Sequence, residues 1–423
     1  MPNPPSRSET RSETRSATRR RLYRRRRLAV FGGILAVLAI VGYTVGVQAA
    51  PIPASAATVG AQTTITQAPA QLDWPKTGAA AVGAVGYEGT LGTSGSAASV
   101  PIASITKTIT ALVVLDEKPL TSATDPGPSI TFTNNDVAIL KSVITAGGSW
   151  ASVTAGSTMT ERQALEAMLL PSANNYAISL AGWAYGSVPA YVTAANAWLA
   201  AHHLSGTHVA DASGLNPGSV STPGDLVEIA KLVMSDAALP SIVDTVSADL
   251  PGSGVQENSN TLLGTLGIDG IKTGTTTQAG YCLMFSSTLT LGAHAVTIVG
   301  VVLGATGESE LHSSVLSLVK SARAGFHEVT LTGAGHTFGD YATAWGSSAQ
   351  LVAAKPASLL VWSDTPITVD VTTQPVREAA SGATVGAATF TLGSEVVRRS
   401  LTLSGDVEGP DLWWRLTNPA ALR

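Results

Sequence analysis

An uncharged apolar run of twenty residues, Leu28 to Val47, constrains this chain more than any other stretch. Its length matches that of an α-helix that crosses a bilayer. Four arginines, Arg24–Arg27, abut the run, and the positive-inside rule then places the N-terminus in the cytoplasm and everything after Val47 outside. A cleaved signal peptide is the competing interpretation, because Val47–Ala49 and Ala54–Ala56 resemble cleavage sites. The run exceeds the apolar region of a typical signal peptide, which favours an uncleaved transmembrane helix over 28–47.

The segments on either side of this run have no periodic arrangement of apolar residues that could form a buried core. Residues 1–27 hold ten arginines against Glu9 and Glu13, a net charge of +8, and we expect an Arg-rich, disordered cytoplasmic tail. Such a tail could bind nucleic acid, but its position beside the apolar run indicates a topology signal, so no nucleic-acid partner is expected. Residues 48–71 are uncharged and rich in Ala, Thr, Pro and Gln, as is typical of a spacer.

The rest of the chain is long enough for two domains. Between residues 72 and 327, helical and strand patterns are mixed, with helices expected over 104–118, 160–170, 174–183, 190–201, 221–234 and 308–324, and strands over 79–87, 281–289 and 293–303. Residues 328–423 predict a small β-rich domain with strands over 350–352, 358–362, 367–372, 387–392 and 399–403. Because Cys282 is the only cysteine, intrachain disulfides are excluded.

Ser104 and Lys107 stand three residues apart at the start of the first expected helix, which puts them on one face. A serine hydroxyl is a poor nucleophile unless a base adjoins it. A lysine can act as that base only if burial or another positive charge lowers its pKa. Ser317 and Lys320 have the same spacing in an ordinary amphipathic helix, so spacing alone does not identify a site.

Two further motifs supply the chemistry that such a pair would need. Ser172 and Asn174 offer a hydroxyl that can pass a proton and an amide that can hold a substrate carbonyl. Lys272 and Thr273 would recognise a carboxylate, and Gly274 has no side chain to keep a substrate backbone from lying along it. Lys272 is also the second positive charge that the first lysine requires.

A rival Lys-Thr-Gly sequence occurs at 76–78, but it precedes Ser104, and we interpret it as a coincidence. The remaining order is S-x-x-K, then S-x-N beginning 68 positions after Ser104, then K-T-G beginning 98 positions after Asn174. This is the ordered motif set of penicillin-recognising serine enzymes. The chain resembles the low-molecular-mass penicillin-binding proteins that act as serine-type D-alanyl-D-alanine carboxypeptidases. The resemblance extends to the sequence segments 211–216, 221–226, 258–263 and 269–280.

The resemblance covers residues 72–327 well and 328–423 more loosely. It implies an α+β penicillin-binding or β-lactamase-like domain with a five-stranded antiparallel sheet and helices on both sides, followed by the small all-β domain. It implies a reaction in which Ser104 attacks a terminal D-Ala-D-Ala bond of a peptidoglycan stem peptide and releases D-alanine. β-Lactam antibiotics would acylate the same serine, no cofactor or metal would be needed, and the catalytic domain would lie outside the cell membrane.

The resemblance also implies a role for each motif residue. Lys107 would be the base, Ser172 a proton relay, and Asn174 a holder of substrate and lysine. Lys272, Thr273 and Gly274 would line the substrate site, and the backbone N–H groups of Ser104 and Thr275 would form an oxyanion hole.

Two positions depart from the family pattern. Asn175 replaces an aspartate that often follows the motif asparagine, and Ser259 replaces an arginine that some members use to bind the substrate carboxylate. Carboxylate affinity is therefore expected to depend on Lys272 and Thr273.

Two other functions use the same motifs. A class A β-lactamase would need a glutamate between Ser172 and Lys272 to activate water, and only Glu228 and Glu257 lie there, neither in the sequence setting of those enzymes. An inactive penicillin-binding fold that serves as a membrane-tethered peptidoglycan-binding or regulatory module is the second alternative. Endopeptidase and transpeptidase activity would use the same residues as carboxypeptidase activity. The histidines near Asp211 are expected to be structural, and no metal site is predicted.

Overall fold

The computed structural model describes residues 7–292, 294–393 and 395–422. They form two compact units. The larger unit consists of Thr66–Val329 with Leu360–Thr365, and the smaller unit consists of the residues up to Ile65, Thr330–Leu359 and the residues from Pro366 onward. The domains expected over 72–327 and 328–423 stay a prediction, and the smaller unit contains the N-terminal residues up to Ile65, which the sequence did not suggest.

A five-stranded antiparallel sheet forms the middle of the larger unit. Its strands run in the order β10 (Ile268–Thr276), β11 (Gly280–Leu291), β12 (His294–Ala305), β2 (Ala79–Ala84) and β3 (Gly92–Ser94). The strands expected over 79–87, 281–289 and 293–303 correspond to β2, β11 and β12, except that residue 293 lies outside the described part. The apolar runs of β11 and β12 are nearly continuous because both faces of the sheet are covered.

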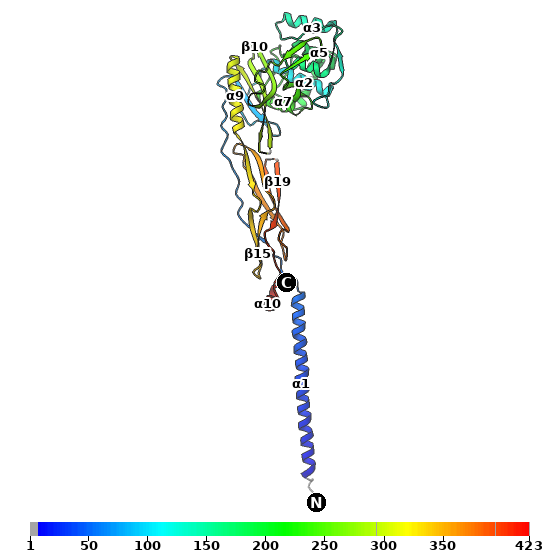
Figure 1. Cartoon of the computed structure of the whole chain (residues 1–423), viewed down its shortest axis with the longest axis vertical. Coiled ribbons are helices and arrows are strands. Elements are labelled where there is room, and N and C mark those ends of the chain that lie inside the picture. Colours follow the sequence, from blue (N-terminus) through cyan, green and yellow to red (C-terminus); the bar gives the residue numbers. More distant parts are fainter. Residues whose placement is uncertain (1–6, 293, 394, 423) are drawn as a thin grey trace. The chain divides into compact units, whose positions relative to one another are not determined.

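Helices cover the two faces of this sheet separately (Figure 1). Side chains alternate between two apolar clusters, as the period of a strand requires. Ala81 and Met284 belong to the cluster that contains α2 (Thr106–Glu117), α4 (Glu161–Leu169), α5 (Asn174–Tyr185) and α7 (Pro223–Ser235). Val82 and Leu283 belong to the cluster that contains α9 (Glu308–Ala324). The expected fold, a five-stranded antiparallel sheet with helices on both sides, is confirmed.

The six helices that capping and periodicity predicted in the larger unit form within two residues of their expected ends, whereas the helices over 134–145 and 239–243 were not predicted. The helices of this unit are α2 (Thr106–Glu117), α3 (Asn134–Thr145), α4 (Glu161–Leu169), α5 (Asn174–Tyr185), α6 (Val188–Ala201), α7 (Pro223–Ser235), α8 (Leu239–Val243) and α9 (Glu308–Ala324), with 3₁₀ turns η1 (Ala103–Ile105) and η2 (Thr265–Gly267). The capping box at α4 is formed, because Thr160 Oγ1 accepts from Gln163 N–H and Gln163 Oε1 accepts from Thr160 N–H.

Short strand pairs complete the larger unit. They are β4 (Val100–Pro101) with β7 (Val220–Ser221), β5 (Ser129–Thr131) with β6 (Thr158–Thr160), and β8 (Ser247–Leu250) with β9 (Gly254–Glu257). The first of these pairs places the segment before Ser104 beside the segment before α7. Two further strands, β13 (Phe326–Thr332) and β16 (Ala357–Trp362), contain residues of both units.

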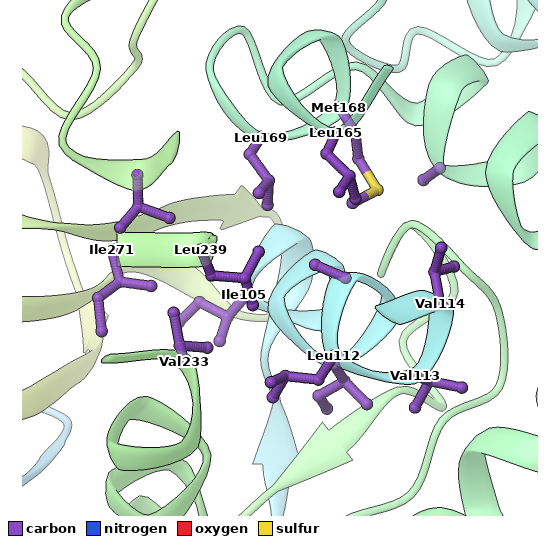
Figure 2. Close-up of a cluster of buried hydrophobic side chains, with 14 of the residues drawn as sticks. Ile105, Leu112, Val113, Val114, Leu165, Met168, Leu169, Val233, Leu239 and Ile271 are labelled. Carbon is purple, nitrogen blue, oxygen red and sulfur yellow. The ribbon is translucent and has the colours of Figure 1, made fainter. Parts of the chain in front are cut away.

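Helix α2 lies at the centre of the larger apolar cluster. Figure 2 shows Leu165 and Leu169 of α4 on one side of α2 and Leu112 of α2 on the opposite side, with Ile105 beside Val233 and Leu239. Ile105 is fully buried. Since burying a side chain of this size contributes about 1.5–3 kcal/mol, this packing fixes the turn that carries Ser104.

Ser104 itself lies in η1, and α2 begins two residues later, at Thr106. The sequence predicted a helix from Ser104 onward. The difference follows from Ala103, whose φ of +48° lies in the left-handed region, so the chain enters the helix through a tight 3₁₀ turn.

The smaller unit contains a six-stranded antiparallel sheet. Its order is β1 (Ala57–Val59), β14 (Thr337–Ala342), β15 (Ser348–Ala353), β19 (Glu395–Leu403), β18 (Thr384–Leu392) and β17 (Thr368–Thr373). Residues 48–71, expected to be a spacer, therefore contribute an edge strand, since Thr58 pairs with Asp340. An uncharged Ala-Thr-Val segment can take part in a ladder whose bonds are made by the backbone.

The smaller unit also contains helix α1 (Arg7–Ala49), helix α10 (Leu412–Thr417) and the turn η3 (Pro419–Ala421). Residues 1–6 of the expected disordered tail lie outside the described part, but residues 7–27 are helical. No Gly or Pro interrupts residues 7–31, so the apolar helix can continue backward through them. One helical stretch, Arg19–Ala49, is long and apolar enough to cross a membrane.

Candidate active site

Lys107 and Ser104 meet at the junction of η1 and α2. Lys107 Nζ lies 2.8 Å from Ser104 Oγ and 2.9 Å from the backbone carbonyl oxygen of Ser213, donating to both. The lysine side chain is fully buried. The predicted nucleophile and base are therefore brought together within hydrogen-bond distance.

The pKa of Lys107 is lowered well below its ordinary value, first by burial and second by the positive charge of Lys272, while Asp211 opposes the shift. A lysine with a lowered pKa can hold a neutral amine, and a neutral amine can accept the hydroxyl proton of an adjacent serine. The site thus meets the electrostatic condition for a serine nucleophile with a lysine base.

Lys272 is the second buried cation of the site and lies on β10. Burial lowers its pKa to about 7. Its Nζ donates to the hydroxyl oxygens of Ser259 and Thr273, each at 3.3 Å, and these two hydroxyls lie 2.7 Å apart. A partly charged ammonium group and two hydroxyl groups at one place can bind a carboxylate.

Gly274 fixes the distance between β10 and the serine turn. A Cβ at this position would stand 3.0 Å from Ile102 O and 3.1 Å from Ser104 N. Any larger residue would therefore push the strand and the serine turn apart by a few tenths of an ångström. Thr275 follows directly and is exposed at the end of β10, where it pairs with Tyr281.

The second motif lies on the loop between α4 and α5. Ser172 is buried and has a φ of +65°, in the left-handed region. Asn174 opens α5, is buried, and its backbone N–H donates to Ser149 O at 2.8 Å. Within the part of the chain described, neither side chain hydrogen-bonds Ser104 or Lys107.

A backbone hydrogen bond joins this loop to Ser259, whose side chain contacts Lys272 and Thr273 of the third motif. The N–H of Ser259 donates to the carbonyl of Leu170 at 2.9 Å, two residues before Ser172. Gly148 lies against the Asn174 amide, since a Cβ there would stand 2.5 Å from Nδ2. The third motif thus contacts the serine turn through Gly274, and the α4–α5 loop is joined to the third motif through Ser259.

Several residues contribute to the site that sequence reasoning did not assign. The most important group is the turn 211–215, in which Asp211 accepts from Ser213 Oγ at 2.6 Å and from Gly214 N at 2.9 Å. This turn aims the Ser213 carbonyl at Lys107. Gly214 has a φ of +77°, and a Cβ there would stand 1.8 Å from Ala103 O. The sequence offered a signal in its Asp-Ala-Ser-Gly-Leu text, but only the fold shows its contact with the lysine.

The rival motifs lie elsewhere. Ser317 and Lys320 are on α9, which packs against the opposite face of the sheet from α2. Gly78 ends the rival Lys-Thr-Gly sequence at the start of β2, where it lies against Leu303 O. Asn175, the first departure from the family pattern, holds the loop before α5, because its side chain bonds the N–H and carbonyl of Ala151 at 3.1 and 3.0 Å.

Glu228, which a β-lactamase interpretation would need, has a structural partner. Its Oε1 lies 2.9 Å from Lys231 Nζ, and the same ammonium group donates to the carbonyls of Tyr87 and Gly89. Glu257 is exposed on β9. Among the described residues, no group of three His, Cys, Asp or Glu side chains could hold a metal ion.

Comparison with known proteins agrees with this geometry. The family model for D-alanyl-D-alanine carboxypeptidase, peptidase S11, matches residues 90–307, which is just over half of the 423 residues. A D-alanyl-D-alanine endopeptidase of Pseudomonas aeruginosa is 33% identical over 201 residues, which cover 45% of this chain and 60% of that protein. A D-alanyl-D-alanine carboxypeptidase of Salmonella typhimurium is 26% identical over 242 residues, covering 56% of this chain and 60% of that protein. The chain thus spans about 60% of the length of these relatives.

Two solved structures are also similar. The Streptomyces K15 DD-transpeptidase matches with a TM-score of 0.51 and 28% identity, covering 58% of this chain and 96% of that one. Penicillin-binding protein 5 from Haemophilus influenzae matches with a TM-score of 0.55 and 19% identity, covering 80% of this chain and 99% of that one, and shows likeness of fold. The chain belongs to the peptidase S11 family of D-alanyl-D-alanine carboxypeptidases.

Proposed function

We propose that this chain is a serine-type D-Ala-D-Ala carboxypeptidase that removes the terminal D-alanine from peptidoglycan stem peptides. The observation that carries the proposal is the buried Lys107 amine, with its lowered pKa, 2.8 Å from Ser104 Oγ. Family membership supplies the substrate class.

Acylation follows from the positions of these groups. Lys107 takes the hydroxyl proton of Ser104 as Oγ attacks the carbonyl carbon of the D-Ala-D-Ala peptide bond. The backbone N–H groups of Ser104 and Thr275 donate to the developing oxyanion. Ser172 passes the proton to the leaving amine, the C–N bond breaks, and D-alanine departs, which leaves an ester on Ser104.

Deacylation uses the same base. Water adds to the ester carbonyl as Lys107 accepts a proton from it, and the bond between the carbonyl carbon and Ser104 Oγ breaks. The serine recovers its proton and the shortened peptide is released. A β-lactam presents a strained cyclic amide to the same nucleophile, so acylation of Ser104 by penicillins is part of the proposal.

Substrate recognition is assigned to the third motif. Lys272, Thr273 and Ser259 form a group of one cation and two hydroxyls beside the nucleophile, and this group would bind the terminal carboxylate of the peptide. Gly274 leaves the edge of β10 open to the peptide backbone, and Asn174 would hold a substrate carbonyl with its amide.

The apolar helix supports a location outside the cytoplasm. Arg19–Ala49 is long and apolar enough to span a membrane, and Arg24–Arg27 directly precede its uncharged run, residues 28–47. We propose that α1 anchors the protein with its N-terminus inside and its catalytic unit outside. Secretion after cleavage of the N-terminal segment is the alternative.

An endopeptidase activity is the second candidate, because the Pseudomonas aeruginosa relative, at 33% identity, is named a D-alanyl-D-alanine endopeptidase. The two activities differ in the group that leaves. The test incubates the protein with a muropentapeptide ending in D-Ala-D-Ala and, separately, with a cross-linked muropeptide dimer. Free D-alanine from the pentapeptide, lost in Ser104→Ala, supports carboxypeptidase activity. Cleavage of the cross-linked dimer without release of D-alanine from the pentapeptide would instead support endopeptidase activity.

A further inference from the structure

Two asparagines hold the short segment 258–260 within the larger unit. Asn258 Nδ2 donates to the carbonyls of Val243 and Thr245 at 3.1 and 3.0 Å. Asn260 is buried, and its Nδ2 donates to the carbonyl of Gly270, in β10, at 3.0 Å. The backbone of the residue between the two asparagines is therefore fixed from both sides.

That residue is Ser259, and its own contacts direct its side chain to the third motif. Its N–H donates to Leu170 O at 2.9 Å. Its Oγ lies 2.7 Å from Thr273 Oγ1 and 3.3 Å from Lys272 Nζ. The side chain at position 259 is thus part of the group that is proposed to receive the end of the peptide.

The three side chains of this group lie at different depths. Lys272 is 1% exposed, whereas Thr273 is half-buried and Ser259 is exposed. A bound peptide therefore meets the two hydroxyls first, and the ammonium group lies beneath them. Within the described part of the chain, Lys272 is the one charged side chain that hydrogen-bonds either hydroxyl.

The hydrogen bonds already made determine what the two hydroxyls can still bind. Each hydroxyl has one hydrogen and two lone pairs. The bond between the hydroxyls uses one hydrogen and one lone pair, and Lys272 Nζ donates to one lone pair on each oxygen. One hydrogen and one lone pair therefore remain for a ligand.

These two positions suit a carboxamide as well as a carboxylate. A carboxylate only accepts hydrogen bonds, so it uses the hydrogen and leaves the lone pair without a partner. A carboxamide, or the next peptide bond of a longer chain, both accepts and donates, and it uses the two positions together. The charge of Lys272 favours the carboxylate, but its pKa of about 7 leaves this lysine partly neutral at neutral pH.

The exposure of Ser259 also leaves room beyond the end of the peptide. Because this side chain reaches solvent, a substituent on the terminal carboxyl carbon would extend from the hydroxyl pair into water rather than into packed side chains.

From this arrangement we infer that Ser259 is a specificity-determining residue, which lets the site accept a leaving residue whose carboxyl group is neutral, as a carboxamide or in a further peptide bond. The inference rests on the proposed function and widens its substrate class. The chemistry is unchanged: Ser104 Oγ forms the ester, the C–N bond of the penultimate D-alanine breaks, and D-alaninamide takes the proton on its amine and leaves in place of D-alanine.

The test uses the full chain in detergent and two pentapeptides that differ only at the C-terminus, one ending in D-Ala-D-Ala and the other in D-Ala-D-alaninamide. Release of D-alanine or D-alaninamide is followed by chromatography with mass detection. Ser104→Ala is the blank, because both products require the same ester. We expect the two values of kcat/KM to agree within about tenfold, since the hydroxyl pair can bond either end.

Ser259→Arg tests whether this residue sets the tolerance. A guanidinium group only donates hydrogen bonds, keeps its charge throughout the assay and pairs with a carboxylate through two bonds. The ratio of kcat/KM for the acid to that for the amide should therefore rise by about tenfold. Thr261→Arg is the matched control, because Thr261 is exposed two residues along the chain, and it should leave the ratio unchanged.

The outcomes separate the inference from the proposed function. Release of D-alanine from the acid, with no D-alaninamide from the amide, would overturn the inference and leave the proposed function intact. No product from either peptide would overturn both. An unchanged ratio in Ser259→Arg, in protein that penicillin still acylates, would show that another residue sets the specificity. If penicillin does not acylate that variant, Ser259→Lys takes its place.

Discussion

At the scale of single residues, the site depends on two lysines buried without a carboxylate in contact. Lys107 and Lys272 are each at most 1% exposed, and their ammonium nitrogens bond hydroxyl and carbonyl oxygens. Burying a cation without a paired anion costs free energy. The same burial lowers the pKa of each lysine toward the pH range in which the proposed reaction would occur.

The coupling of the two lysines predicts a pH effect. Acylation needs a neutral Lys107, so its rate rises with pH through that lysine's pKa. Lys272→Met removes a positive charge that lowers the pKa of Lys107, so the rise of the acylation rate with pH should move to higher pH. Lys272→Arg keeps the charge and should leave the pH profile unchanged. The check is the rate constant of acylation by benzylpenicillin from about pH 5 to about pH 10. A pH profile that does not move in Lys272→Met would show that the charge of Lys272 does not affect the pKa of Lys107.

Ser259 predicts a second effect at this scale. Its hydroxyl lies 2.7 Å from Thr273 Oγ1 and 3.3 Å from Lys272 Nζ. Ser259→Ala removes a group expected to bind the substrate carboxylate, and kcat/KM for the pentapeptide should fall by about 5–10-fold, which corresponds to about 1 kcal/mol. The loss should appear mainly in KM. A fall in kcat with KM unchanged would assign Ser259 to the chemical step instead.

The motif residues could be predicted from the sequence, whereas their supports could not. Ser104, Lys107, Asn174 and Lys272 occur in an ordered set whose spacing is visible in the chain. The contribution of Ser213 is a backbone carbonyl, which every residue has, so no residue type could mark it. Only the turn around Asp211 turns that carbonyl toward Lys107.

At the scale of elements, the turn 211–215 and η1 hold each other in place. Gly214 is the residue of this turn that comes closest to η1. Its position predicts that alanine costs much more stability there than at Gly186, a glycine of similar backbone conformation. Gly214 has a φ of +77° with Ala103 O where a Cβ would lie, and Gly186 has a φ of +79° with nothing within 4 Å. Alanine in the left-handed region costs about 1 kcal/mol, and the clash adds about 2 kcal/mol more.

Gly214→Ala should therefore lower the free energy of unfolding by about 3 kcal/mol, and Gly186→Ala by about 1 kcal/mol. Chemical denaturation of both variants measures this. Acylation by penicillin should slow in Gly214→Ala alone, because only that substitution displaces the serine turn. Equal losses of stability would mean that the turn relaxes without cost.

Some helices and strands could be predicted from the spacing of their apolar residues, and others could not. The capping box at Thr160 and the apolar runs of β11 and β12 predicted those elements because burial and capping act on neighbouring residues. Strand β10 was not predicted as a strand, since Gly270, Lys272 and Gly274 break its apolar pattern. Lys272 and Gly274 belong to the candidate site, and residues selected for a site need not follow the apolar pattern of a strand. The edge strand β1 was missed because its ladder is made by backbone groups.

At the scale of the whole molecule, Glu161 links stability to pH. It is fully buried, and both of its carboxylate oxygens lack a hydrogen-bond partner in the described structure. Burial, followed by the nearby charge of Asp125, raises its pKa from 4.5 to about 7. A carboxyl group whose pKa is raised on folding stabilises the fold fully below pH 4.5, and this contribution is lost as pH rises through about 7.

Glu161→Gln should therefore stabilise the protein at alkaline pH and have little effect in acid. The expected gain in the free energy of unfolding is about 2 kcal/mol at about pH 8, and close to none at about pH 4. Urea denaturation at the two pH values checks this, with Glu117→Gln as an exposed control that should change neither. A loss of stability at the higher pH would show that the charged carboxylate has a favourable partner.

The central claim is that Ser104 is a nucleophile activated by Lys107. The most direct measurement is the intact mass of the full chain in detergent before and after benzylpenicillin, beside Ser104→Ala and Lys107→Ala. The account predicts a lasting increase of one penicillin mass, absent from the serine variant and strongly slowed in the lysine variant. An adduct that survives Ser104→Ala, or no adduct on the unaltered protein while the drug stays intact, would contradict it.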